Sequence, residues 1–265
     1  MWSLLLIPLI FYLSILVLLF AFQTRMIFPA GSVGGAGPLP AGAERLTVEA
    51  GEGATLHGVH LPARRPGSEQ ILILGFGGNA WNAEDAAGFL SDLYPQADVV
   101  AFHYRGYRPS TGSPSAAALL ADAPRVFDSA VAKVTPRRTV AVGFSVGSGV
   151  AASLAGRRPV DGLILVTPFD SLKAVAVGHY RWLPVGLLFR HEMKAAESLA
   201  SAPVPTAIIA GGRDTLIPPP RTDALRAAVA NLVYHRTLAS AGHNDIYERP
   251  DFRAAMREAL AAVAP

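Results

Sequence analysis

The sequence predicts an α/β fold, with a mostly parallel central sheet, helices on both of its faces and one apolar helix in front of the domain. Three observations lead to this prediction. The chain opens on an uncharged apolar run, short β-rich runs alternate with stretches of helical spacing from Glu44 onward, and one β-rich run ends in a serine between two glycines. Such alternation is typical of a parallel sheet covered by helices.

Composition limits the function classes. The 265 residues suffice for a large core, and a hydrophobic share of 51% argues against disorder. The net charge of +3 is spread without a basic run, which argues against nucleic-acid binding. The chain has no cysteine, so disulfides, thiolate metal sites and cysteine nucleophiles are excluded.

The first segment is predicted to cross a membrane. Trp2 to Phe22 carries no charge, and Pro8 is its only helix breaker. About 20 such residues span the hydrocarbon core of a bilayer. A buried core helix or a cleaved signal peptide is the alternative, but the run is too long for the first and lacks the basic start of the second. We expect a single-pass anchor over residues 1–24, on which the lone Arg25 does not assign an orientation.

A flexible linker is expected over residues 25–43, since the stretch PAGSVGGAGPLPAGA offers little to pack or to pair. The domain is expected over residues 44–265. It opens with two predicted strands, RLTVEA and TLHGVHLP, which flank Gly51-Glu52-Gly53 as a hairpin.

Buried parallel strands are predicted for the rest of the domain. QILILGF is the first, and the helical stretch NAEDAAGFLSDLY follows it with Asn82 as its N-cap. DVVAFHY, RTVAVGF, DGLILVT and TAIIAGG repeat the strand pattern, and LVYHRTL makes one more. Ligands gather at the carboxyl ends of such strands, so the candidate site is sought there.

Ser145 is the candidate nucleophile. The sequence GFSVG follows the strand RTVAV and precedes a stretch of small helical residues, which is the context that a nucleophile elbow requires. The glycines permit a strained turn that exposes the hydroxyl. An ordinary glycine-rich turn is the alternative.

A serine needs a base and an orienting acid. His243 follows the last strand in AGHND, and Asp214 follows the preceding one in GGRDTLIPP, which gives the chain order expected for this elbow. Asp170 also follows a strand and is the alternative acid, or a helix cap. His103 reaches the same edge and is predicted to shape the substrate pocket. His57 and His60 point to opposite faces of a strand, so they make a poor metal pair.

An oxyanion hole is predicted from two backbone N–H groups, those of Phe76 and Val146. The glycine-rich LGFGGNAWN leaves amides bare after a strand, and Phe76 is expected to face Val146 across the pocket. A phosphate-binding loop is the rival interpretation, but the Lys-Ser/Thr pair of a P-loop is missing. No cofactor and no metal are expected.

Together these motifs resemble the α/β-hydrolase superfamily over Glu44 to Ala264, in particular its single-pass, membrane-anchored serine hydrolases with serine-aminopeptidase-like or depalmitoylase-like domains. The resemblance rests on LGFGGNAWN, HYRGYRPSTGSPS, the elbow, GGRDTLIP and AGHND. Leu74 stands where the family commonly has the histidine of its oxyanion loop, and His103 where it has an aspartate. Pocket polarity is therefore expected to differ from that of relatives.

The predicted function is hydrolysis of a carboxylic ester or thioester through an acyl-enzyme, with acyl or lipid-like substrates near the membrane. A small cap is expected around residues 170–202, where HYRWLPVGLLF suits either a lid or a core helix. A peptidase or amidase of the same fold is one alternative, and a catalytically silent, membrane-tethered binding scaffold is the other.

Overall fold

The structure is a computed structural model that describes residues 2–67 and 69–265. Its described strands form one sheet in the order β1-β2-β4-β3-β5-β6-β7-β8. The pairs β1–β2 and β2–β4 are antiparallel, and the strands from β4 through β3 to β8 are parallel. The predicted mostly parallel α/β fold is thus confirmed. The strands are β1 (Glu44–Glu49), β2 (Thr55–Leu61), β3 (Ile71–Phe76), β4 (Asp98–Phe102), β5 (Arg138–Phe144), β6 (Gly162–Val166), β7 (Thr206–Gly211) and β8 (Leu232–Leu238).

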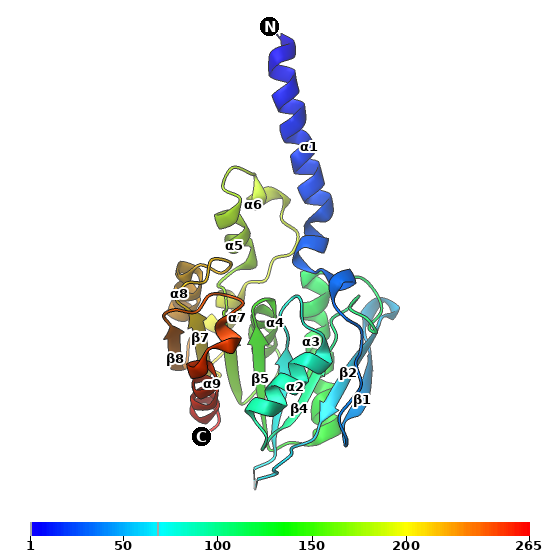
Figure 1. Ribbon diagram of the computed structural model, residues 1–265, viewed down its shortest axis with the longest axis vertical. Coiled ribbons are helices and arrows are strands. Elements are labelled where there is room, and N and C mark those ends of the chain that lie inside the picture. Colours follow the sequence, from blue (N-terminus) through cyan, green and yellow to red (C-terminus); the bar gives the residue numbers. More distant parts are fainter. Residues whose placement is uncertain (1, 68) are drawn as a thin grey trace.

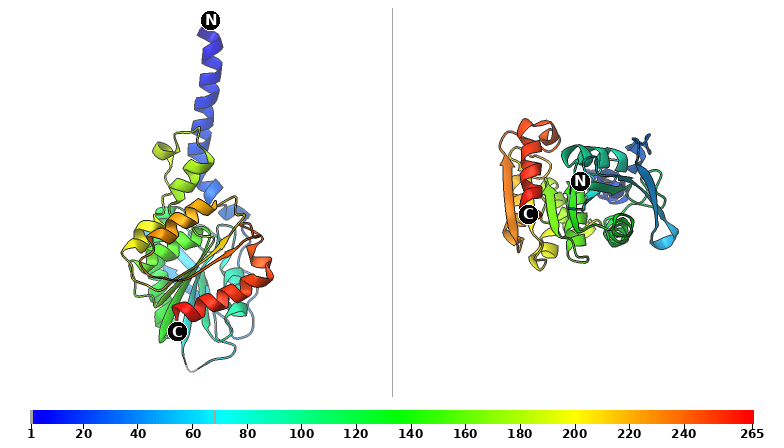
Figure 2. Two further views of the ribbon diagram at one scale, coloured as in Figure 1. Left: turned by 90° about the vertical axis from the view of Figure 1, so that its left-hand side faces the viewer. Right: turned by 90° about the horizontal axis from the view of Figure 1, so that it is seen from below.

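Helices cover both faces of this sheet, as Figure 2 shows from below. On one face, α2 (Ala83–Leu93) and α9 (Pro250–Val263) pack against the apolar side chains of the central strands. On the other face lie α3 (Ala116–Val134), α4 (Val146–Ala155), α7 (Ala195–Ala200) and α8 (Pro219–Ala228). Asn82 caps α2 as predicted, since its side chain accepts a hydrogen bond from the Asp85 N–H at 2.7 Å. Among the described residues, short 3-10 helices are η1 (Ala30–Ser32), η2 (Gly51–Gly53) and η3 (Ile246–Glu248).

The N-terminal helix α1 (Trp2–Ile27) projects away from the domain (Figure 1). Its stretch Leu6–Ile27 is long and apolar enough to cross a membrane, and only 6% of its most apolar window is buried. The helix continues past the predicted end at Phe22, and its last turns contact the domain. A signal sequence passes the same test of length and composition.

The segment expected to be a flexible linker has defined contacts. Residues 25–27 continue α1, and Phe28 is buried in the core at 2% exposure. Val33 packs on the same core cluster, and Arg45 donates a hydrogen bond to the Gly37 carbonyl at 2.8 Å. The physical reason is that the glycine- and proline-rich stretch begins after Phe28, whose ring anchors it to the domain.

The predicted cap divides into two parts. We call residues 172–189 the cap segment; it contains α5 (Leu172–His179) and α6 (Val185–Leu188) and rises on the same side of the domain as α1 in Figures 1 and 2. The remaining helix, α7, belongs to the core instead, because its Ala195 and Leu199 are fully buried. The residues of α7 are therefore apolar because they pack in the core, which does not account for the apolar residues of the cap segment.

Candidate active site

Ser145 lies in a strained turn between β5 and α4. Its backbone has φ 51° and ψ −118°, a region that L-residues rarely adopt. Two glycines make the turn possible by close approach. A Cβ at Gly143 would lie 2.5 Å from the Gly147 carbonyl oxygen, and a Cβ at Gly147 would lie 2.2 Å from the Phe76 carbonyl oxygen. No larger residue fits at either position, so the sequence pattern follows from the backbone geometry.

The structure brings Ser145, His243 and Asp214 together in one chain of hydrogen bonds. The Nε2 atom of His243 lies 2.9 Å from Ser145 Oγ, and its Nδ1 atom lies 2.7 Å from Asp214 Oδ2. Because a carboxylate can only accept, Nδ1 carries the proton and Nε2 is free to accept from the serine hydroxyl. The side chains of His243 and Asp214 are only 9% and 3% exposed.

Asp214 is held in place by its own loop. Its Oδ1 atom accepts hydrogen bonds from the N–H groups of Leu216 at 2.9 Å and Ile217 at 2.7 Å. Both carboxylate oxygens are therefore engaged, one by the backbone and one by the imidazole. A carboxylate fixed in this way can orient His243 without rotating.

Asp170, the alternative acid, lies elsewhere. Its Oδ2 atom accepts a hydrogen bond from Arg221 at 3.1 Å, and its backbone carbonyl accepts from the Ala196 N–H. The carboxylate that contacts His243 is that of Asp214.

The loop after β3 lies beside the serine. Leu74, expected in this loop, instead lies inside β3 with no exposed surface, and Phe76 is the last residue of that strand. The loop residue next to the serine is Gly78, where an added Cβ would lie 3.8 Å from Ser145 Cβ. Val146 is the first residue of α4, so its N–H has no acceptor within the helix.

Two tyrosines hold the carbonyls of this loop, and neither was singled out from the sequence. The hydroxyl of Tyr104 donates to the Gly77 carbonyl at 2.7 Å, and that of Tyr107 donates to the Asn79 carbonyl at 2.9 Å. Burial raises the pKa of both tyrosines, so the hydroxyls keep their protons. The HYRGY motif thus supports the loop that faces Ser145, a role that becomes visible only once β3 and β4 are paired.

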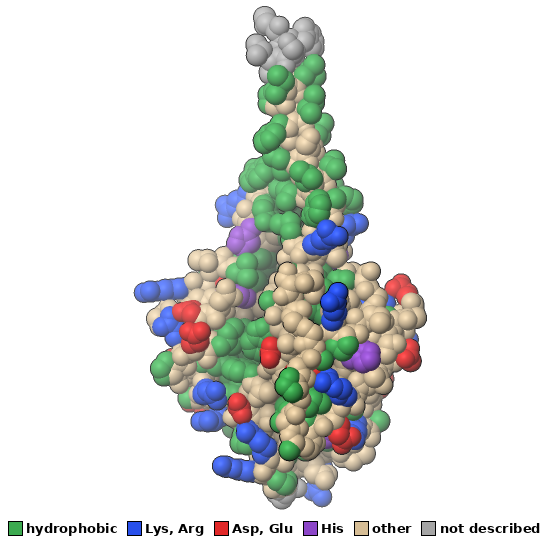
Figure 3. Space-filling model, turned by 45° about the vertical axis from the view of Figure 1, so that its right-hand side comes forward, with side chains coloured by type: hydrophobic (Ala, Val, Ile, Leu, Met, Phe, Trp, Pro, Cys, Tyr) green, Lys and Arg blue, Asp and Glu red, His purple; other side chains and the backbone are tan. Residues whose placement is uncertain are grey.

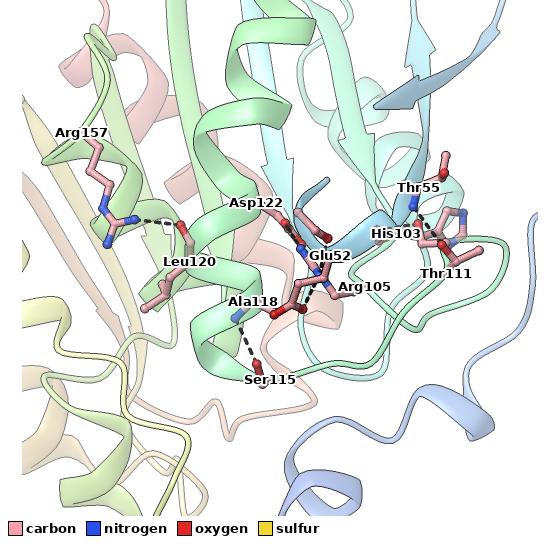
Figure 4. A network of polar contacts seen from close by, with 12 residues as sticks. Glu52, Thr55, His103, Arg105, Thr111, Ser115, Ala118, Leu120, Asp122 and Arg157 are labelled. Carbon is pink, nitrogen blue, oxygen red and sulfur yellow. Dashed lines mark hydrogen bonds and ion pairs between the residues drawn. The ribbon is translucent and has the colours of Figure 1, made fainter. Parts of the chain in front are cut away.

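The segment that carries these tyrosines is fixed by a polar network (Figure 4). Arg105 is 4% exposed and donates to both carboxylate oxygens of Asp122 on α3, at 2.6 and 3.1 Å. It also donates to the Gly51 carbonyl at 2.8 Å. A bidentate arginine between two elements restricts the loop between them.

His103, predicted to shape the substrate pocket, lies in a buried contact with α2. Its side chain is 1% exposed, and Nε2 lies 2.7 Å from Oε2 of Glu84 on α2. Burial lowers the pKa of His103. Likewise, His60 Nε2 lies 2.7 Å from Asp98 Oδ1, a pairing within the sheet. Each histidine thus pairs with a partly exposed carboxylate, and neither of these contacts involves Ser145, His243 or Asp214.

Comparisons with known proteins identify a matching family and several similar proteins. A family profile described as alpha/beta hydrolase fold matches residues 71–183. The uncharacterized protein Rv2307c of Mycobacterium tuberculosis is 35% identical over 238 residues, which cover 88% of this chain and 84% of that one. The lysophosphatidylserine lipase ABHD12 of Xenopus tropicalis is 38% identical over 96 residues, 32% of this chain and 25% of that one.

Among solved structures, an esterase of Pyrococcus furiosus has a TM-score of 0.66 at 16% identity. The likeness covers 87% of this chain and 96% of that one. At this identity the likeness concerns the arrangement of strands and helices, which matches over nearly the whole of both domains.

Proposed function

The chain belongs to the α/β-hydrolase family, and on that premise we propose that it is a serine hydrolase that cleaves a carboxylic ester or thioester. The observation that carries the proposal is the continuous array from Asp214 through His243 to Ser145. Ser145 is the nucleophile, His243 the general base and Asp214 the orienting acid. Each has the chemical type and the contacts that its role requires.

The reaction proceeds in two halves. The Ser145 hydroxyl attacks the carbonyl carbon while His243 Nε2 takes its proton. Asp214 keeps the imidazole in the required tautomer and stabilises the imidazolium. His243 then gives the proton to the leaving alcohol or thiol, which departs and leaves an acyl-enzyme. Water, deprotonated by His243, attacks the ester carbonyl of the acyl-enzyme, and the carboxylic acid leaves as Ser145 regains its proton.

The negative charge of the tetrahedral intermediate is held by backbone N–H groups. Val146 supplies one, since it opens α4 and its N–H has no acceptor within the helix. The second comes from the β3 end and its loop, where Phe76 is the predicted donor and Gly78 lies beside the serine. One such donor lowers the barrier by on the order of 3 kcal/mol.

In this proposal the substrate is an ester or a thioester with an acyl or lipid-like group, located near a membrane. Three features support this part of the proposal: the apolar helix α1, the apolar cap segment, and a local likeness to a protein named as a lysophosphatidylserine lipase. In this proposal residues 1–24 form a single-pass anchor and residues 44–265 the catalytic domain. A tethered enzyme meets membrane-borne esters at raised effective concentration.

A substrate panel tests the proposal. The full chain and its Ser145→Ala variant are assayed on p-nitrophenyl esters of short and long acyl chains, on acyl thioesters and on aminoacyl amides. We expect the full chain to hydrolyse esters or thioesters and Ser145→Ala to lose that activity. Turnover of the amides alone would make the chain a peptidase. A folded chain with no turnover on any substrate would favour a binding scaffold.

A further inference from the structure

An apolar groove lies between the C-terminal half of α1 and the cap segment. It has a volume of about 200 Å³ and is lined by Leu16, Leu19 and Phe20 on one wall and by Ala176, Leu183 and Leu188 on the other, among others. Gln23 lines it too, but its amide donates to the Leu188 carbonyl at 3.2 Å and accepts from the Arg190 N–H at 2.9 Å. The groove therefore offers its occupant an almost purely apolar surface.

The outside of the cap segment is mostly apolar as well, with His179 and Arg181 as exposed exceptions. Val177, Tyr180, Trp182 and Leu187 are 42%, 36%, 58% and 88% exposed. We call the junction of α1 and the cap segment the neck. Figure 3 shows hydrophobic side chains gathered along α1 and around the neck. A patch of this kind is costly in water and marks a protein or membrane contact.

Contacts between α1 and the cap segment fix how high the cap segment reaches. The Tyr12 hydroxyl donates to the Trp182 carbonyl at 3.2 Å. With a rise of 1.5 Å per residue, the predicted span Trp2–Phe22 is about 30 Å long, and Tyr12 lies about 15 Å along the helix from Phe22. The hydrocarbon core of a bilayer is about 30 Å thick. If Trp2–Phe22 crosses it, the Tyr12–Trp182 contact lies near the middle of the core, so the cap segment occupies the leaflet on the side of the domain.

Arg190 lies near the domain-side end of the predicted span. Its guanidinium lies 4.5 Å from the centroid of the Phe20 ring and donates to the Phe20 carbonyl at 3.2 Å. Positive charges at this level also favour anionic lipid headgroups.

Both walls of the groove contact loops of the catalytic site. The Ile27 carbonyl, at the end of α1, accepts a hydrogen bond from the Asn79 side chain at 3.1 Å, and Asn79 follows Gly78 beside the serine. On the other wall, His179 of α5 donates from Nε2 to the Leu216 carbonyl at 2.8 Å. Leu216 in turn donates its N–H to Asp214.

From the groove, the exposed apolar residues and the Tyr12–Trp182 contact, we infer that the cap segment is a second membrane-inserted element. The groove between it and α1 takes the acyl chain of a bilayer lipid. The occupant has this chemistry because the walls are apolar, because half of the groove is built from the spanning helix, and because the groove opens where lipid surrounds that helix. That the bound lipid is also a substrate rests on the proposed function; its binding does not.

Cysteine accessibility tests the membrane position, and the chain is suited to it because it contains no cysteine. Leu187→Cys and Val233→Cys place single thiols at two exposed apolar sites, one in the cap segment and one on β8. Both are reconstituted in phosphatidylcholine–phosphatidylglycerol vesicles and treated with a membrane-impermeant maleimide. We expect the thiol at position 187 to react at least tenfold more slowly than that at 233. Equal rates would overturn the inference.

A photoreactive lipid tests the groove. Phosphatidylcholine with a diazirine in its acyl chain is added to the vesicles, and cross-linked peptides are mapped by mass spectrometry. We expect labels on residues 16–27 and 176–189, and a several-fold loss of labelling in Ala176→Trp, which fills the groove. The control Ala227→Trp, exposed on α8, keeps the wild-type labelling. Labelling confined to the first half of α1 would contradict the groove as a lipid site. Labelling should also occur in Ser145→Ala, because lipid binding does not require turnover. If the wild type is labelled but shows no turnover, the proposed function fails while the lipid site stands.

Discussion

The carboxyl edge of the sheet and the neck formed by α1 and the cap segment are built by opposite means. At the edge, the Asp214 side chain is 3% exposed and every oxygen of its carboxylate is hydrogen-bonded. At the neck, Leu187 is 88% exposed, and a few polar contacts join two apolar surfaces. At the edge, the Asp214 carboxylate has all its hydrogen-bond partners within the protein. At the neck, apolar surface stays exposed and requires lipid or a partner protein to cover it. In the proposed function, chemistry and membrane location are thus specified by separate parts of the chain.

The largest expected effect at the edge comes from removing the base. In His243→Gln no group can take the Ser145 proton, so turnover on the best ester of the panel should fall on the order of 10⁶-fold. His235→Gln, which changes a half-buried histidine on β8, should keep wild-type turnover. A loss of less than about tenfold in His243→Gln would show that the array is not catalytic.

Next in size is the orienting acid. Asp214→Asn keeps an acceptor for the Leu216 and Ile217 N–H groups but presents an amide to His243 Nδ1, which favours the wrong tautomer. Turnover should drop on the order of 10⁴-fold with little change in melting temperature. The matched variant Asp170→Asn should stay within about threefold of wild type, since it touches Arg221 and not the imidazole. The reverse ranking would assign the acid to Asp170.

A smaller effect is expected at the loop that would supply an oxyanion donor in the proposed mechanism. Tyr107→Phe leaves the Asn79 carbonyl without its partner, and a shifted loop should lower kcat about tenfold, or about 1.4 kcal/mol, with little change in KM. Tyr94→Phe is the control, since the buried Tyr94 hydroxyl donates to the Met256 carbonyl at 2.8 Å, between α2 and α9. Both variants should lose stability, but only Tyr107→Phe should lose kcat. Equal kcat values would make Tyr107 purely structural.

The smallest effect is expected at the neck, in its response to pH. His191 is 4% exposed, lies 2.8 Å from the Thr24 hydroxyl of α1, and has a pKa lowered by burial from its ordinary value of 6.5. Because the folded pKa is depressed, the unfolded chain binds more protons below about pH 6.5, and stability should fall as pH drops through that value. The melting temperature, recorded from about pH 8 to 5 in detergent, should decline less in His191→Gln. Equal declines would exclude His191 as a source of acid sensitivity.

The sequence predicted the edge well because each of its parts is local. A buried strand, a five-residue elbow and a short loop after each strand are all recognised within about ten residues, and parallel strands bring their carboxyl ends together. Ser145, His243 and Asp214 therefore came together as expected, although their catalytic roles stay a proposal. Tyr104 and Tyr107 were missed because their acceptors belong to the loop after a different strand.

The neck could not be predicted in the same way. Composition indicated a spanning helix and an apolar stretch, but no local pattern links Tyr12 to Trp182 or Gln23 to Leu188, which lie 170 and 165 residues apart in the chain. The prediction of a flexible linker missed a contact for a similar reason. It was based on the glycines and prolines after Pro29 and did not take into account the ring of Phe28, which is buried in the core.

The central claim is that Ser145 is an activated nucleophile, and fluorophosphonate labelling tests it most directly. The full chain in detergent is treated with a fluorophosphonate probe, digested, and the adduct located by mass spectrometry, with Ser145→Ala and heat-denatured wild type as controls. The account predicts one adduct, on Ser145, absent from both controls. A wild type that takes no label, or a Ser145→Ala variant that labels equally well, would contradict it.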